Sequence, residues 1–200
     1  MKKALLIIIG VLLALLAPAQ DIDSLFRVFE NSRGEAAYQA ALAIDEVIGR
    51  DPNFEADTDK DEIKLKVLRT MILYYFDNDD FQHVVKYSEV GIDHYRKIDD
   101  LFNLAGCYMT LANAYQRLGQ LDKAIDCYNQ CSEIMDEMGG EMAEVNKRYV
   151  MNNIAEIYLA MNEYDSAEEL YRKSVVIGGT APAKEPLVYA RVEKDKVEKF

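Results

Sequence analysis

The sequence has no tryptophan, only four prolines, and two histidines among 200 residues. On one helix, His83 and His94 would lie roughly 16 Å apart along the axis, which is too far for them to share a metal ion. The sequence also lacks the G-x-S-x-G, H-E-x-x-H and P-loop motifs that mark common catalytic and nucleotide sites. It therefore predicts a protein without enzymatic activity, and with neither a metal nor another cofactor.

Calcium-loop chemistry is also incomplete. The stretch from Asp57 to Asp61 alternates aspartates as such a loop does, but Glu62 stands where glycine is needed and Leu68 where the bidentate glutamate is needed. We interpret the aspartates instead as an acidic helix start near Asp61, where carboxylates favour the helix dipole.

Cysteine is scarce, and the count of three is odd. In an exported chain, an odd count leaves at least one thiol free or paired between chains. The three residues are Cys107, Cys127 and Cys131, with no zinc-type spacing. We interpret them mainly as small core residues, and a Cys107–Cys131 disulfide remains an alternative.

Basic residues are fewer than acidic ones, 23 against 35, which gives a formal net charge of −12. Such a surface repels nucleic acid, because it has no basic patch to release counterions from phosphates. The charge favours solubility and cationic partners.

The first residues have the pattern of an export signal. Lys2 and Lys3 precede an apolar stretch, residues 4–17, and an A-x-A cleavage site at 17–19. The apolar stretch is shorter than the ~20 residues of a spanning helix. We expect a cleaved signal peptide at 1–19 and a periplasmic or extracellular protein without membrane insertion after cleavage; an uncleaved anchor is the alternative.

The central feature is a repeated pattern. LANAYQRLGQLDKAIDCY, residues 111–128, returns forty-three residues later as IAEIYLAMNEYDSAEELY, residues 154–171. In the first copy, apolar and small residues at helical spacing end at Gly119, and a second helical stripe follows. A pattern that returns at a fixed period predicts stacked antiparallel helix pairs.

These residues resemble the tetratricopeptide repeat (TPR) family, in its longer-helix variety. Two units carry the resemblance. In the first, the positions of the family pattern are occupied by Tyr108, Leu111, Ala112, Tyr115, Gly119, Ala124, Tyr128 and Cys131. In the second, they are occupied by Met151, Ile154, Ala155, Tyr158, Asn162, Ala167, Tyr171 and Ser174. The resemblance implies an all-α fold, a right-handed α-solenoid of antiparallel helix pairs with about four repeats and a C-terminal capping helix.

Weaker units precede these two. Met71, Ile72 and Tyr75 with Val84 and Gly91 form one, and Ala40, Ile44 and Val47 followed by Pro52 form another. The expected organisation is a signal peptide at 1–19, a degenerate helix pair at 20–56, repeats at 60–98, 101–138 and 141–178, and a final helix at 183–200. That helix is either a polar cap or the first helix of a further repeat in a truncated chain.

The resemblance also implies a site, because the first helix of each TPR pair lines the concave wall of the superhelix. The residues expected to face that wall are Arg69, Leu73, Phe76, Met109, Asn113, Gln116, Arg117, Asn152, Asn153 and Glu156. Asn113 matches a place where one subfamily grips a peptide carboxylate, but Met109 replaces the lysine that completes that grip. The wall is rich in amides, which suits an extended peptide backbone.

The sequence therefore predicts a non-catalytic adaptor or scaffold that binds a protein or peptide partner of unknown identity outside the cytoplasm, with self-association left open. The alternative is the sensory input region of a membrane signalling protein, present here as a fragment.

Overall fold

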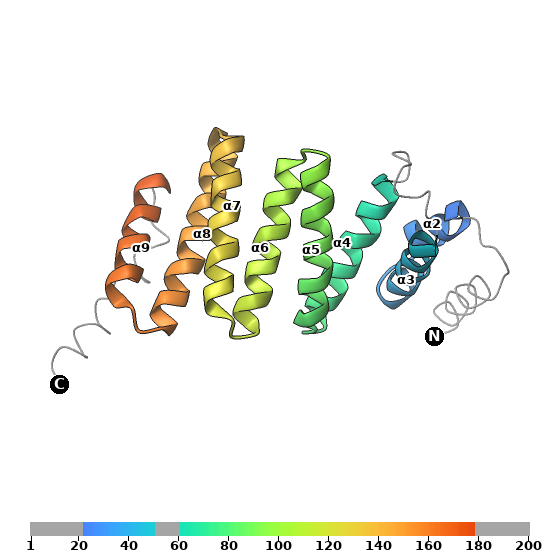
Figure 1. The fold of residues 1–200 in the computed structure, drawn as a ribbon, viewed down its shortest axis with the longest axis horizontal. Helices are drawn as coiled ribbons and strands as arrows, with labels where there is room; N and C mark the ends of the chain where they lie inside the picture. Colours follow the sequence, from blue (N-terminus) through green and yellow to red (C-terminus); the bar gives the residue numbers. More distant parts are fainter. Residues whose placement is uncertain (1–21, 51–60, 179–200) are drawn as a thin grey trace. The chain divides into compact units, whose positions relative to one another are not determined.

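The computed structural model describes residues 22–50 and 61–178, and within these ranges the regular elements are eight α-helices (Figure 1). They are α2 (Ile22–Glu30), α3 (Glu35–Arg50), α4 (Asp61–Asp77), α5 (Phe81–Lys97), α6 (Leu101–Arg117), α7 (Leu121–Met138), α8 (Gly140–Ala160) and α9 (Tyr164–Gly178). The predicted all-α class is confirmed. The expected signal peptide at 1–19 and the expected helix at 183–200 lie outside the described residues.

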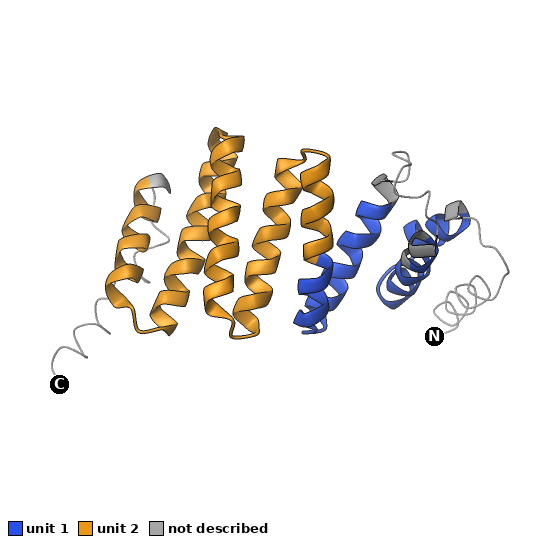
Figure 2. Cartoon of the chain, in the orientation of Figure 1, with its two compact units in different colours: residues 1–87 blue, residues 88–200 orange. Residues whose placement is uncertain are grey.

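The chain divides into two compact units, residues 1–87 and residues 88–200, and the boundary falls within α5 (Figure 2). In the first unit, α3 packs against both α2 and α4. In the second unit, α7 packs against α6 and α8, and α9 packs against α8. None of the helices in the described ranges combines the length and the apolar character that a membrane crossing requires.

Four helix ends share one turn geometry. Asp79, Asp99, Gly119 and Asn162 all have positive φ, between 56° and 72°. In each turn, the N–H of the next residue donates to the carbonyl five positions earlier, at 2.8 to 3.0 Å. This is the Schellman arrangement, which satisfies carbonyls left unpaired at a helix end. The expected helix break at Gly119 is confirmed, and Asn162 adopts the same conformation in the next pair.

The core of the second unit contains the small and aromatic residues of the repeated pattern. Ala112, Ala124 and Tyr128 are fully buried where α6 and α7 meet. Ala155, Ala167 and Tyr171 are buried in the same way between α8 and α9. The alanines permit close approach of the helices, and the tyrosine rings fill the remaining volume.

The cysteines of this unit are unpaired, so the alternative of a Cys107–Cys131 disulfide is not realised. Cys107 and Cys131 are buried, as expected of small core residues, and Cys127 is half-buried. The Cys131 thiol donates to the carbonyl of Ala105 at 3.2 Å, which ties α7 to α6.

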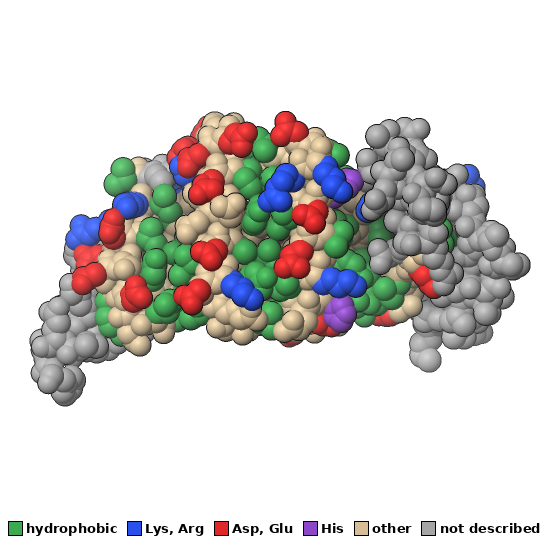
Figure 3. All heavy atoms as spheres, in the orientation of Figure 1, with side chains coloured by type: hydrophobic (Ala, Val, Ile, Leu, Met, Phe, Trp, Pro, Cys, Tyr) green, Lys and Arg blue, Asp and Glu red, His purple; other side chains and the backbone are tan. Residues whose placement is uncertain are grey.

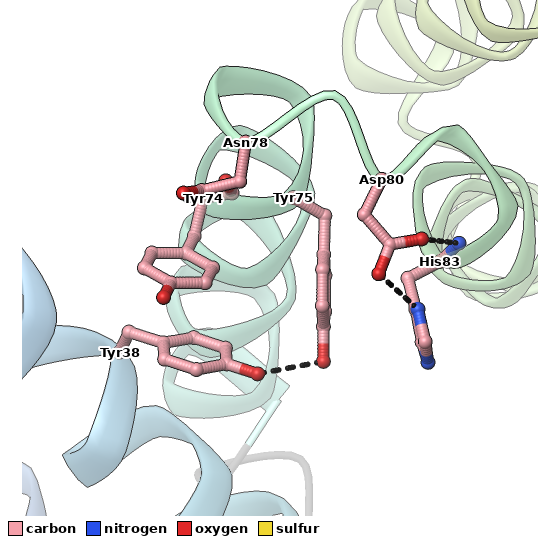
Figure 4. Close-up of polar contacts among 6 residues, drawn as sticks. All are labelled: Tyr38, Tyr74, Tyr75, Asn78, Asp80 and His83. Carbon is pink, nitrogen blue, oxygen red and sulfur yellow. Dashed lines mark hydrogen bonds and ion pairs between the residues drawn. The ribbon is translucent and has the colours of Figure 1, made fainter.

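The first unit is organised by an aromatic cluster between α3, α4 and the start of α5 (Figure 4). The rings of Tyr38 and Tyr74 stack with centroids 3.6 Å apart, and the hydroxyls of Tyr38 and Tyr75 are 2.7 Å apart. Tyr75 also stacks on His83, whose ring and backbone N–H are both bonded to Asp80. His83 is exposed, as expected, and it belongs to a helix cap and an aromatic stack.

Candidate functional site

The expected wall residues of α6 lie on one exposed stripe. Met109, Asn113 and Gln116 are half-buried and Arg117 is exposed, and they point away from the buried face formed by Leu104, Leu111 and Ala112. The stripe extends toward the start of the helix through two further exposed residues, Phe102 and Gly106. We call these residues the α6 stripe: Phe102, Gly106, Met109, Asn113, Gln116 and Arg117.

The α8 helix carries the equivalent stripe. Asn152 and Asn153 are half-buried and Glu156 is exposed, whereas Val150, Ile154 and Ile157 are buried. Three exposed apolar side chains continue it toward the start of α8, Met142 (67% exposed), Val145 (39%) and Tyr149 (54%). These six residues are the α8 stripe.

Tyr128 of α7 connects the two stripes. Its hydroxyl donates to Asn113 Oδ1 at 2.5 Å, and Gln116 Oε1 lies 3.4 Å away. Burial raises the pKa of this hydroxyl to about 12, and a hydrogen bond from Asn153 acts in the opposite direction. The hydroxyl therefore joins α6 and α8 and keeps its proton at neutral pH.

This network orients the amides. Because Asn113 accepts from Tyr128 through its carbonyl oxygen, its NH₂ group is left for a ligand. The same orientation brings the carbonyl of Gln116 toward the hydroxyl. The polar end of the α6 stripe therefore presents amide donors, which suit carbonyl or carboxylate oxygens of a partner.

The α8 stripe also contains an unsatisfied polar atom. Asn152 Oδ1 is buried without a hydrogen-bond partner, and so is Arg148 Nε one turn earlier. Buried polar atoms are normally paired, so each such exception needs an explanation. Because this oxygen has no access to solvent, a partner on the surface can bond to it only after the Asn152 side chain rotates.

Glu156 takes the place in α8 that Asn113 takes in α6. Burial raises the pKa of Tyr171 to about 12, and the charge of Glu156 acts in the same direction. Glu156 thus acts on Tyr171 of α9 through its charge, whereas Asn113 accepts a hydrogen bond from Tyr128.

The remaining expected residues belong to the first unit. Arg69, Leu73 and Phe76 share one exposed face of α4, with Leu73 55% exposed. Phe76 contacts Phe81 edge to face, with ring centroids 5.6 Å apart. The structure thus places seven of the ten expected residues on α6 and α8, and the other three on α4 of the first unit.

The sequence interpretation missed part of the surface. Phe102, Gly106, Met142, Val145 and Tyr149 were not expected to be on the wall, although they continue its helical spacing by about two turns. The stripes could have been found at full length by extending that spacing toward the start of each helix. The role of the Tyr128 hydroxyl was also missed, because the pattern assigns this tyrosine to the core.

A pocket of about 270 Å³ lies elsewhere in the second unit. It is lined by Arg96, Asp99, Leu101, Leu104, Tyr108, Gln130, Ile134 and Glu137, none of which belongs to either stripe. Arg96 donates to the Tyr108 hydroxyl at 2.6 Å, so its guanidinium already has a partner there.

Charged groups on this unit are dispersed. Acidic and basic side chains alternate with hydrophobic ones on the face drawn in Figure 3. Among the described residues, no cluster of three or more His, Cys, Asp or Glu side chains could hold a metal ion.

Comparisons with known proteins agree with this fold. Residues 103–176 match the family model described as tetratricopeptide repeat. No match was found among curated proteins.

Among solved structures, the chain is similar to a putative kinesin light chain from Podosopora anserina with nearly identical TPR-like repeats. The TM-score is 0.61 at 16% identity, over 89% of this chain and 87% of that one. A variant of the same protein gives the same TM-score and identity. BtubC (BKLC) from P. vanneervenii is similar over 86% of this chain and 63% of that one, with a TM-score of 0.52 at 17% identity. At these identities the likeness is one of fold.

Proposed function

Residues 103–176 belong to the tetratricopeptide repeat family, and on that premise we propose that the chain is a non-catalytic adaptor that binds a polypeptide partner on the α6 and α8 stripes. The observation that carries the proposal is the Tyr128 network. It orients an amide of α6 toward the outside and bonds to α8 at the same time. Repeat scaffolds of stacked helices commonly bind partners on such extended surfaces.

The chemistry of the stripes favours a peptide backbone over a small metabolite. Side-chain amides are spaced along two neighbouring helices, so they can bond to successive carbonyl groups of an extended chain. A small-molecule site would instead be concave and largely enclosed.

We further propose that this binding takes place outside the cytoplasm. The support is the sequence alone: Lys2 and Lys3, the apolar stretch 4–17 and the A-x-A site. N-terminal sequencing of the protein from fractionated cells tests this point. A start near Gln20 in the envelope or secreted fraction supports export, and an intact Met1 in the cytoplasm contradicts it.

Binding itself is tested by affinity capture with the full-length protein, followed by direct titration of the captured partner. The variant changes Gln116 and Asn152 to Ala, and the matched control changes Asn129 to Ala, an exposed amide of α7 outside both stripes. We expect the stripe variant to lose about tenfold or more in affinity, as when two hydrogen bonds are removed. Equal affinity of both variants, with unchanged thermal unfolding, would contradict the proposal.

A further inference from the structure

The pocket of about 270 Å³ in the second unit lies outside both stripes. Its lining comes from α5, α6 and α7 and from the turn that joins α5 to α6. Pockets for drug-sized ligands typically have at least about 300 Å³, so this pocket suits a smaller molecule.

The inner lining of the pocket is apolar. Leu104 is buried, and Leu101, Tyr108 and Ile134 are half-buried. The charged lining residues are all exposed, so they form a rim above these side chains. A molecule in the pocket therefore meets apolar surface inside and charged groups at the rim.

The cation of the rim is Arg96. Its Nη2 donates to the hydroxyl of Tyr108 at 2.6 Å, and its Nη1 lies 3.9 Å from Asp93 Oδ1, which is too far for a hydrogen bond. A hydroxyl cannot neutralise a positive charge, and a guanidinium has five N–H donors. Arg96 is therefore held beside α6 with donors left for a carboxylate, which a guanidinium binds through two parallel hydrogen bonds.

The same rim carries two carboxylates, Asp99 and Glu137. Within the described part of the chain, neither side chain has a hydrogen-bond or ion-pair partner. Gln130 donates its amide N–H to Glu133 at 2.9 Å, which leaves its carbonyl oxygen as a further acceptor. These acceptors suit an ammonium group, which has only donors.

The opposite charges of this rim are not paired with one another. Neither Asp99 nor Glu137 forms an ion pair with Arg96 in the described residues, although all three line one pocket. A simple anion would be repelled by the two carboxylates, and a simple cation would be repelled by the guanidinium. A small molecule that carries both charges matches both sides of the rim.

We propose that this pocket binds a free apolar α-amino acid. Its carboxylate bonds to the Arg96 guanidinium, and its ammonium group bonds to the carboxylates of Asp99 and Glu137. Its side chain packs on the apolar inner lining, where Leu104 lies. A polypeptide end supplies only one of the two charges and is therefore a poorer match. This inference goes beyond the proposed function and does not depend on it, because no lining residue belongs to either stripe.

The test is a titration of the full-length protein with free leucine, followed by amide NMR shifts. Because the rim charges are exposed, we expect a dissociation constant in the millimolar range. Three analogues each remove one feature: N-acetyl-leucine lacks the cation, leucinamide lacks the anion, and glycine lacks the side chain. Each should bind about tenfold or more weakly than leucine.

Two variants locate the effect. Arg96→Gln should weaken leucine binding about tenfold and remove the preference for leucine over leucinamide, because no guanidinium remains for the carboxylate. Its matched control is Lys97→Gln, which removes the neighbouring exposed cation outside the pocket. Glu137→Gln should weaken leucine binding and reduce the preference for leucine over N-acetyl-leucine. Its control is Glu141→Gln, an exposed carboxylate of α8 that does not line the pocket.

Several outcomes would overturn the inference. If leucinamide or N-acetyl-leucine binds as tightly as leucine, the ligand is a simple cation or a simple anion. If both variants keep native leucine affinity, the binding site lies elsewhere. No binding of leucine, methionine or phenylalanine at millimolar concentration also overturns it. Each of these results leaves the proposed function standing, since that function is tested separately through Gln116 and Asn152.

Discussion

The pair α6–α7 and the pair α4–α5 follow the same pattern at an offset of forty residues, but they differ at three linked places. Where α7 has Tyr128, α5 has Ser88. Where α6 has Asn113 and Gln116, α4 has Leu73 and Phe76. The tyrosine hydroxyl and the amides that accept its hydrogen bond are thus both present in the α6–α7 pair and both absent from the α4–α5 pair.

The pair α8–α9 helps to explain this difference. It keeps the aromatic hydroxyl as Tyr171 and a polar residue, Glu156, at the place of Asn113. A tyrosine at this place therefore accompanies a polar stripe residue, whereas Ser88 accompanies an apolar one. We infer that the tyrosine serves the outer surface as well as the core, so changes to it should affect both.

The largest effect is expected from Tyr128→Ser, which makes α7 like α5 at this position. The variant removes a fully buried ring, so the free energy of unfolding should fall by about 3–5 kcal/mol. Urea denaturation measures it. A loss below about 1 kcal/mol would show that the core closes over the missing ring and that the two pairs are interchangeable here.

A smaller effect isolates the hydroxyl. Tyr128→Phe retains the ring and should cost about 1–2 kcal/mol, because Asn113 and Asn153 lose their shared partner. In the double variant with Asn113→Leu, which copies α4, the two costs should not add, since the first change has already broken the bond. Additive costs would mean that the amide and the hydroxyl act independently.

The turns provide a comparison between Gly119 and Asn162, which adopt φ of 72° and 63° at equivalent helix ends. Gly119→Ala should destabilise by about 1 kcal/mol, because a Cβ atom is disfavoured at positive φ. Asn162→Gly should stabilise by up to about 1 kcal/mol for the same reason. Thermal unfolding of both variants provides the measurement, and effects of the same sign would contradict the shared geometry.

Ser88 offers a test of the other pair. Its hydroxyl is buried and has no hydrogen-bond partner. Ser88→Ala should therefore leave stability unchanged or raise it by up to about 1 kcal/mol, because an unsatisfied polar group is removed. Urea denaturation that shows a clear loss would mean that the hydroxyl has a role in the core.

The repeated residues made the helices predictable because small and aromatic side chains at fixed spacing have one favourable packing. Ala112, Ala124 and Tyr128 are buried as the pattern predicts. The site was less predictable. The resemblance to the repeat family placed Asn113 and Gln116 on the stripe, but it does not tell which way an amide turns, since that depends on the Tyr128 proton.

The last prediction concerns alkaline pH, at which the buried hydroxyls of Tyr128 and Tyr171 should stop contributing to the free energy of unfolding. Burial raises the pKa of Tyr128 and of Tyr171 to about 12, above the ordinary value of 10.0. Between pH 10 and 12 the unfolded chain therefore holds fewer protons on these hydroxyls than the folded chain. The stability they contribute is complete below pH 10 and is lost as the pH rises through 12.

The cysteine pKa values are also raised, to about 11 or 12, so the total loss begins near pH 9 for every variant that keeps the thiols. The contribution of Tyr128 is the difference between the native chain and Tyr128→Phe in urea denaturation at a series of pH values. We expect the variant to lose less stability above pH 10. Parallel curves would mean that the hydroxyl ionises in the folded protein as it does in water, and Tyr128 would then not be the buried link between α6 and α8.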